Sequence, residues 1–118
     1  MMRFVEELPV YLHREPVDFR KAINGLSVIV QESMQLDPFG CACYVFTNRY
    51  RNRLKILYWD KNGFCLWLKR LEKDKFAWPR TRNEDCVILS IKELHWLLEG
   101  FDIWRQPPHQ RLYFDSVI

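Results

Sequence analysis

The sequence predicts a single α+β domain spanning residues 1–118, with a core at about residues 10–104 and a looser tail at residues 105–118. At 118 residues the chain has the length of one domain, and 48% of its residues are hydrophobic, enough for a core without disulfides. Short β-type runs also accompany two segments of helical periodicity. We therefore expect a mostly antiparallel sheet packed against one long amphipathic helix, with a second short helix near the C-terminus at an edge of the sheet.

Five runs are typical of strands because they are short and rich in β-branched or aromatic residues. They lie at residues 10–12, 43–47, 54–59, 64–70 and 86–89. The third and fourth runs form the clearest pair, since Asn62-Gly63 between them is a strong hairpin signal. A two-residue turn is expected to set Tyr58 opposite Trp67, whereas a longer turn shifts this register. Both residues suit the core, although aromatic side chains also stack on nucleobases.

The long helix is predicted to begin at Asp18, a good N-cap residue, and to reach about Met34. Its apolar residues recur at helical spacing, at Phe19, Ala22, Ile23, Leu26, Ile29 and Val30. Gly25 in its middle costs about 1 kcal/mol relative to Ala, so we expect a close backbone contact there. Arg20 and Lys21 fall in the first turn, where the helix dipole disfavours positive charge; they meet either a phosphate or water.

The second helix has clear signals at both ends. Ser90 and Glu93 form a capping box, and Leu89 and Leu94 a hydrophobic staple. Gly100 is expected to end the helix. Beyond it, residues 112–118 suit an edge strand, a partner-binding tail or a frayed end.

Positive charge is concentrated in the middle of the chain. Residues 44–82, which we call the basic segment, contain 11 basic and 3 acidic residues, whereas the remainder contains 7 basic and 12 acidic residues. The net charge of +3 therefore hides a strong asymmetry. A basic, aromatic-rich segment between acidic flanks favours contact with a polyanion; the alternative is a solvated sheet with ordinary lysines and arginines on its outer side.

Every second residue from Arg49 to Lys55 is positively charged. In an extended strand these four side chains share one side, where arginines bind phosphate oxygens bidentately. The alternative is a mobile, charged hairpin tip. Tyr50 either stacks on a base or caps the core. The candidate nucleic-acid-binding residues are Arg49, Tyr50, Arg51, Arg53, Lys55, Lys69, Arg70, Arg80, Arg82, Arg20 and Lys21.

No motif indicates catalysis, a cofactor or a metal. The sequence lacks a glycine-rich phosphate loop, HExxH and GxSxG, and Asp18, Asp37 and Asp60 fall at predicted caps or turns, where Asp is expected for backbone reasons. Cys41 and Cys43 are separated by one residue, which is not the spacing of common zinc sites, so we expect reduced thiols. No apolar run approaches the roughly 20 residues of a membrane helix, and we expect a cytoplasmic protein without membrane contact.

Several segments resemble one family. The longest is NRYRNRLKILYWD at residues 48–60, continued by NGFCLW at 62–67; DFRK at 18–21, DPF at 37–39 and LLEG at 97–100 add to it. The chain resembles the TnpB-type accessory protein of a large family of bacterial insertion sequences, encoded by the second open reading frame beside a DDE-type transposase. The short turn closed by Gly40 and the tail after Trp104 depart from the family pattern.

This resemblance implies a non-catalytic helper in DNA transposition, whose partners are DNA and the transposase of the same element. It supplies no catalytic residues. Two mechanisms remain open. In the first, the basic residues grip DNA phosphates, which carry little sequence information. In the second, the same basic surface binds the transposase or another protein of the element.

Overall fold

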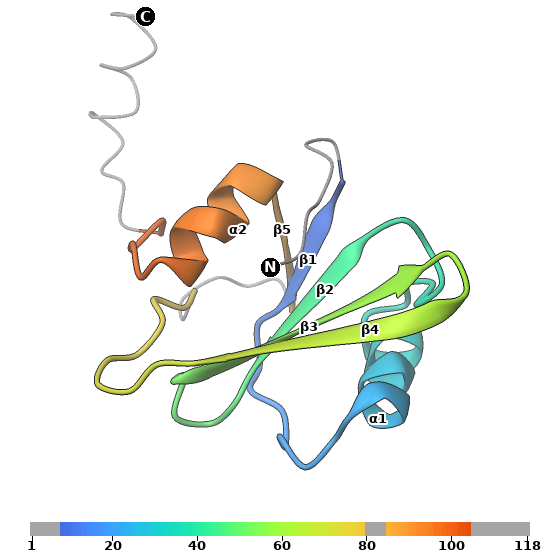
Figure 1. The fold of residues 1–118 in the computed structure, drawn as a ribbon, viewed down its shortest axis with the longest axis horizontal. Coiled ribbons are helices and arrows are strands. Elements are labelled where there is room, and N and C mark those ends of the chain that lie inside the picture. Colours follow the sequence, from blue (N-terminus) through green and yellow to red (C-terminus); the bar gives the residue numbers. More distant parts are fainter. Residues whose placement is uncertain (1–7, 80–84, 105–118) are drawn as a thin grey trace, which may run out of the picture.

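A five-stranded mixed sheet forms the centre of the protein. The structure, a computed structural model, describes residues 8–79 and 85–104 (Figure 1). The strands are β1 (Val10–His13), β2 (Cys43–Thr47), β3 (Arg53–Asp60), β4 (Gly63–Arg70) and β5 (Cys86–Leu89). Their order across the sheet is β4-β3-β2-β1-β5. All five predicted strand runs are therefore present, and they belong to one sheet.

The sheet is mostly antiparallel, as expected, with one exception. β1 pairs with β5, β2 with β3 and β3 with β4 in antiparallel fashion, whereas β1 and β2 run parallel. The parallel pair follows from the connection between these two strands, which carries the first helix. Such a crossover, unlike a tight hairpin, returns the chain to the same end of the sheet.

Each face of the sheet packs against its own helical segment. On the first face, which we call the α1 face, Tyr44, Phe46 and Leu57 pack with Leu26 and Val30 of the first helical segment. On the opposite face, the α2 face, strand residues pack with the second helix. That core contains Val10, Leu12, Val45, Leu54, Ile56, Leu94, Leu97 and Leu98. The second helix therefore lies over a face, and its predicted position at an edge is wrong.

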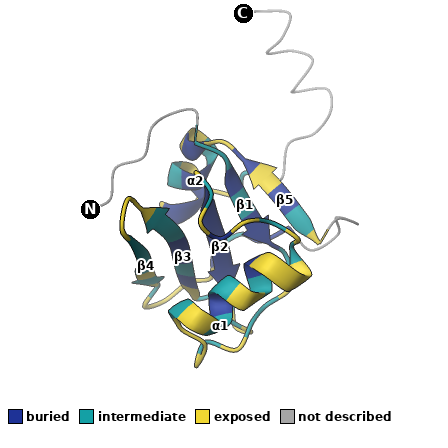
Figure 2. Ribbon diagram, turned by 90° about the vertical axis from the view of Figure 1, so that its right-hand side faces the viewer, coloured by how far each residue is buried: buried dark blue, intermediate teal, exposed yellow. Residues whose placement is uncertain are grey.

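The first helical segment is shorter than predicted. It consists of α1 (Ile23–Val28) and a π-helical continuation, η1 (Ile29–Ser33), so its start at Asp18 is wrong. The Asp18 carboxylate accepts hydrogen bonds from Arg20 instead of capping a helix, and Ala22 at the N-cap has no side-chain bond. The predicted apolar face is present, because Leu26 and Val30 are buried in the core between the segment and the sheet. Figure 2 shows exposed residues on α1 in yellow.

The second helix, α2 (Ile91–Leu98), has both predicted ends. Ser90 Oγ accepts from the Glu93 N–H, and the Glu93 carboxylate accepts from the Ser90 N–H, which completes the capping box. At the other end Gly100 has φ +100°, and the Phe101 N–H donates to the Trp96 carbonyl. This is the Schellman arrangement, which glycine favours because it lacks a Cβ.

The β3–β4 hairpin has a two-residue turn but a different register from the one predicted. Tyr58 lies opposite Cys65, and Trp67 lies opposite Ile56. Asp60 pairs with Gly63, so the turn residues are Lys61 and Asn62, and the left-handed φ of +52° falls on Lys61. Gly63 therefore begins β4 instead of occupying the turn. Tyr58 and Trp67 pack against the core of the α2 face, as expected for core aromatics.

Gly25 contacts a side chain, not the backbone. A Cβ there would lie 3.0 Å from both Cβ and Cγ of Lys21, so the expected close backbone approach is wrong. Arg80, Arg82 and the tail from residue 105 lie outside the described residues.

Candidate nucleic-acid interface

Arg53 and Arg70 lie opposite each other at the open end of the β3–β4 hairpin. Both side chains are exposed, and both belong to the α1 face because side chains alternate along a strand. Lys55 is two residues farther along β3 and lies on the same face. Like charges directly opposite each other are unfavourable in a sheet, so this end of the hairpin concentrates positive charge at some cost in stability.

Lys55 joins the hairpin to the loop before α1. Its Nζ donates to the Phe19 carbonyl at 2.9 Å and to the Lys21 carbonyl at 2.8 Å, and it lies 4.7 Å from the centre of the Phe19 ring. Burial, and then the nearby charge of Arg53, lower the pKa of Lys55. These bonds bring Arg20 and Lys21 to the open end of the hairpin.

Five basic residues from three segments therefore lie near one another, because Lys55 joins the loop that carries Arg20 and Lys21 to the strands that carry Arg53 and Arg70. We call this group the basic cluster, and its members are Arg20, Lys21, Arg53, Lys55 and Arg70. Its carboxylates are Asp18, whose oxygen lies 2.6 Å from Arg20 Nη2, and Glu72, 2.9 Å from Arg70 Nε. Hydrogen bonds from Arg20 lower the pKa of Asp18 to about 2. Both pairs are exposed, and each guanidinium has five N–H donors, so the arginines keep donors for a further anion.

The extended strand predicted from Arg49 to Lys55 is not formed at Arg49 and Arg51. Residues 48–52 form a turn in which Arg51 has φ +58°, so Arg49 and Arg51 do not alternate in register with Arg53. The turn is well anchored. Asn48 Oδ1 accepts from the N–H groups of Asn52 and Arg53, both at 3.1 Å.

Two further bonds tie this turn to the segment after β4. The Arg51 carbonyl accepts from Phe76 N–H at 2.7 Å, and the Asn52 carbonyl accepts from Leu71 N–H at 2.8 Å. A loosely held hairpin tip does not fit these bonds. Arg49 and Tyr50 project from the turn as exposed side chains, whereas Arg51 is half-buried, and its Nε has no hydrogen-bond partner among the described residues.

Lys69 lies apart from the basic cluster, on the α2 face. Its Nζ donates to the Leu98 carbonyl at 2.7 Å, near the end of α2. A lysine at this place satisfies a helix C-terminal carbonyl and complements the helix dipole. The structure therefore brings together five of the sequence-predicted residues, places Arg49, Tyr50 and Arg51 in an adjoining turn, and separates Lys69 from them.

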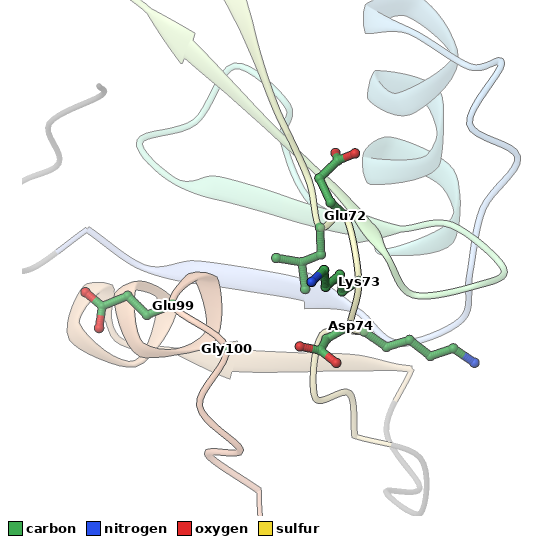
Figure 3. Close-up of a pocket in the computed structure, with 7 residues that line it drawn as sticks. Glu72, Lys73, Asp74, Glu99 and Gly100 are labelled. Carbon is green, nitrogen blue, oxygen red and sulfur yellow. The ribbon is translucent and has the colours of Figure 1, made fainter.

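A shallow surface hollow of about 480 Å³ lies between the segment after β4 and the end of α2 (Figure 3). Its walls mix both charges, and the labelled carboxylates of Glu72, Asp74 and Glu99 do not converge on one point. Across residues 8–79 and 85–104, no group of three or more His, Cys, Asp or Glu side chains is placed to hold a metal ion. In the same part of the chain, no helix is long and apolar enough to cross a membrane.

The fold and the cluster thus define a small α+β protein with a cationic surface built from a hairpin and a helix-entry loop. Comparison with known proteins identifies its family: residues 8–108 match the family described as IS66 Orf2 like protein, and the chain belongs to this family. This confirms the resemblance to accessory proteins of bacterial insertion sequences.

Two relatives come from Sinorhizobium fredii. Uncharacterized protein y4hO is 32% identical over 102 residues, which cover 86% of this chain and 87% of the relative. Uncharacterized protein y4jC is 34% identical over 95 residues, 80% of each chain. No solved structure matches the chain.

Proposed function

We propose that the protein is a non-catalytic accessory factor in DNA transposition that contacts DNA phosphates through the basic cluster. Family membership supports the role in transposition. The observation that carries the DNA contact is the pairing of Arg53 with Arg70 across two strands, with Lys55, Arg20 and Lys21 beside them. A phosphate between the two arginines relieves their repulsion, because each guanidinium then faces an anion.

The members of the basic cluster have different roles in this proposal. Arg53, Arg70, Arg20 and Lys21 contact phosphates, since their side chains are exposed. Lys55 is a positioning residue, because its ammonium group already binds two backbone carbonyls. Arg49 and Tyr50, exposed in the adjoining turn, extend the surface, and Tyr50 offers a ring for stacking. Arg80 and Arg82 remain members of the proposed interface on the basis of sequence alone.

Such an interface binds mainly by releasing counterions from DNA. The logarithm of the affinity then falls linearly with the logarithm of the salt concentration, and each phosphate contact adds about 0.9 to the slope. Phosphate contacts carry little sequence information, so we expect similar binding to an end of the element and to unrelated DNA.

The test compares two double variants of equal charge. Arg53→Ala with Arg70→Ala removes two members of the basic cluster, and Lys61→Ala with Lys92→Ala removes two exposed cations elsewhere, in the hairpin turn and on α2. Binding to a labelled element end and to unrelated DNA is measured by fluorescence anisotropy between about 50 and 200 mM salt, the range over which several phosphate contacts change affinity strongly.

We expect the first variant to bind both DNAs more weakly and to reduce the salt slope by about 2, with a much smaller effect of the second. Equal losses in both variants contradict a localised interface. Absence of DNA binding by the unaltered protein contradicts the proposal, and co-purification with the transposase then tests the alternative that this surface binds protein.

A further inference from the structure

β4 is an edge strand whose apolar side chains are incompletely covered. Among the residues that the structure describes, it is the end strand of the sheet and pairs only with β3 (Figures 1 and 2). None of its eight residues is buried, although five consecutive residues, from Phe64 to Leu68, are hydrophobic. Leu54, Ile56 and Leu57 of the neighbouring β3 are fully buried. Leu68 is 55% exposed on the α1 face.

Along residues 63–68, this edge lacks the features by which proteins usually prevent strands from pairing. Such features are charged residues, prolines, bulges and very short edge strands. From Gly63 to Leu68, β4 contains neither a charge nor a proline, and it has eight residues paired continuously with β3. The opposite edge differs, because β5 has only four residues. β4 is therefore the edge that is open to a further strand.

An aromatic trio supports the β4 edge near the hairpin turn. Phe39, Trp59 and Phe64 lie with each pair of ring centres 5.0 Å apart. This spacing leaves no room for a cation between the rings, so the trio is a solid apolar surface and not an aromatic cage. Phe39 is 57% exposed and contacts Phe64, which belongs to β4 itself.

We propose that two copies of this chain form a dimer by antiparallel pairing of their β4 edges. With the two-fold axis at Leu66, Leu68 of one copy lies opposite Phe64 of the other, so each exposed leucine is covered by a braced aromatic ring. The pairing is self-complementary, as a two-fold interface requires. Main-chain hydrogen bonds supply affinity, and the apolar side chains determine the register.

The charges at the ends of β4 are compatible with a second copy of this chain at the β4 edge. Lys69 and Arg70 come opposite Gly63 and Asn62 of the second copy, so no like charges face each other across the new pair. Arg70 and Glu72 of one copy lie near the turn that carries Asp60 and Lys61 in the other. Each copy therefore contributes one positive and one negative side chain to this contact. A nucleic acid is a less suitable occupant of this edge, because residues 63–68 contain no cation. The dimer does not depend on the proposed DNA contact.

The test measures the mass of the purified full-length protein without DNA by sedimentation equilibrium, from about 1 to 100 µM, a range that brackets the weak to moderate affinity expected of an interface of modest size. Leu68→Asn places an uncharged amide in the proposed interface. Ile88→Asn is the matched control, because Ile88 is 67% exposed on the same face but on the β5 edge. Circular dichroism checks that both variants fold, as their exposed positions predict.

We expect a monomer–dimer equilibrium for the unaltered protein and for Ile88→Asn, and a dissociation constant raised at least tenfold for Leu68→Asn, the size expected for placing a polar group in an apolar contact. A monomer throughout this range overturns the proposal. A dimer that Leu68→Asn leaves intact, or that Ile88→Asn dissociates equally, also overturns it, since either result assigns the interface elsewhere.

Discussion

The Lys55 ammonium group connects β3 to Phe19 and Lys21, which lie 36 and 34 residues earlier in the sequence. It donates to two carbonyls in the loop before α1 and approaches the Phe19 ring. Burial lowers the pKa of this group, yet the two hydrogen bonds and the ring favour its charged form. The side chain thus fixes the position of Arg20 and Lys21 relative to β3, and with it the shape of the basic cluster.

Replacing Lys55 by methionine is expected to lower the free energy of unfolding by about 1–2 kcal/mol, because the Phe19 and Lys21 carbonyls lose a charged donor while the aliphatic chain is retained. Urea denaturation followed by circular dichroism measures the change. Lys61→Met is the control, since Lys61 is exposed in the hairpin turn. Equal stability of the two variants contradicts the positioning role of Lys55.

The sequence could indicate a cation at position 55 but not its partners. Alternating charge from Arg49 to Lys55 suggests a row of phosphate-binding side chains, and the pattern holds only for the part that lies in β3. The turn at 48–52 depends on bonds between Asn48 and Asn52 and on carbonyls that accept from Leu71 and Phe76. The bonds from Leu71 and Phe76 join residues that are distant in sequence, so no local periodicity reveals them.

At the scale of elements, the two helices differ in how much of their structure their own residues determine. α2 carries its start and stop signals within the helix and its caps, at Ser90, Glu93 and Gly100, and all three act as predicted. The first helical segment has apolar periodicity but no side-chain cap at Ala22, and the Asp18 carboxylate, which accepts from the Arg20 N–H at 2.9 Å, lies four residues before it. A cap residue and its local backbone bond therefore do not by themselves start a helix.

The end of α2 gives a prediction with a matched control. Gly100→Ala is expected to lower the free energy of unfolding by about 1–2 kcal/mol, because φ +100° is strained for any residue with a Cβ. Gly63→Ala should leave stability unchanged or slightly higher, since Gly63 begins a strand, lacks a left-handed φ and has open space for a Cβ. Thermal unfolding of both variants measures the difference, and equal losses contradict this account of the helix end.

At the scale of the whole molecule, local pairing was predictable and distant pairing was not. The β3–β4 hairpin follows from two apolar runs and a turn signal, although its register depends on where Asn62-Gly63 falls relative to the turn. The parallel pairing of β1 with β2 and the position of β5 beside β1 depend on the crossover through α1 and on the burial of both sheet faces. No run of neighbouring residues contains that information.

The two proposals together determine how the whole assembly meets DNA. Antiparallel pairing about Leu66 keeps the α1 faces of both copies on the same side, because residues directly opposite each other share a face. Each Arg70 lies four residues from the axis, so the two basic clusters are separated by roughly 26 Å along the strands, at about 3.3 Å per residue. A duplex rises about 3.4 Å per base pair, so about eight base pairs span this distance.

A dimer should therefore bind a 20-base-pair duplex at least tenfold more tightly than a hairpin duplex of about six base pairs, because only the longer one engages both clusters. Leu68→Asn leaves every cation in place and should lose this advantage, whereas Ile88→Asn should keep it. Anisotropy titrations at one salt concentration compare the affinities of the three proteins for the two duplexes. The contrary result is a Leu68→Asn variant that is monomeric and still binds the longer duplex more tightly. In that case the two basic clusters of a dimer do not act on one DNA, although the DNA contact and the β4 dimer can each still be correct.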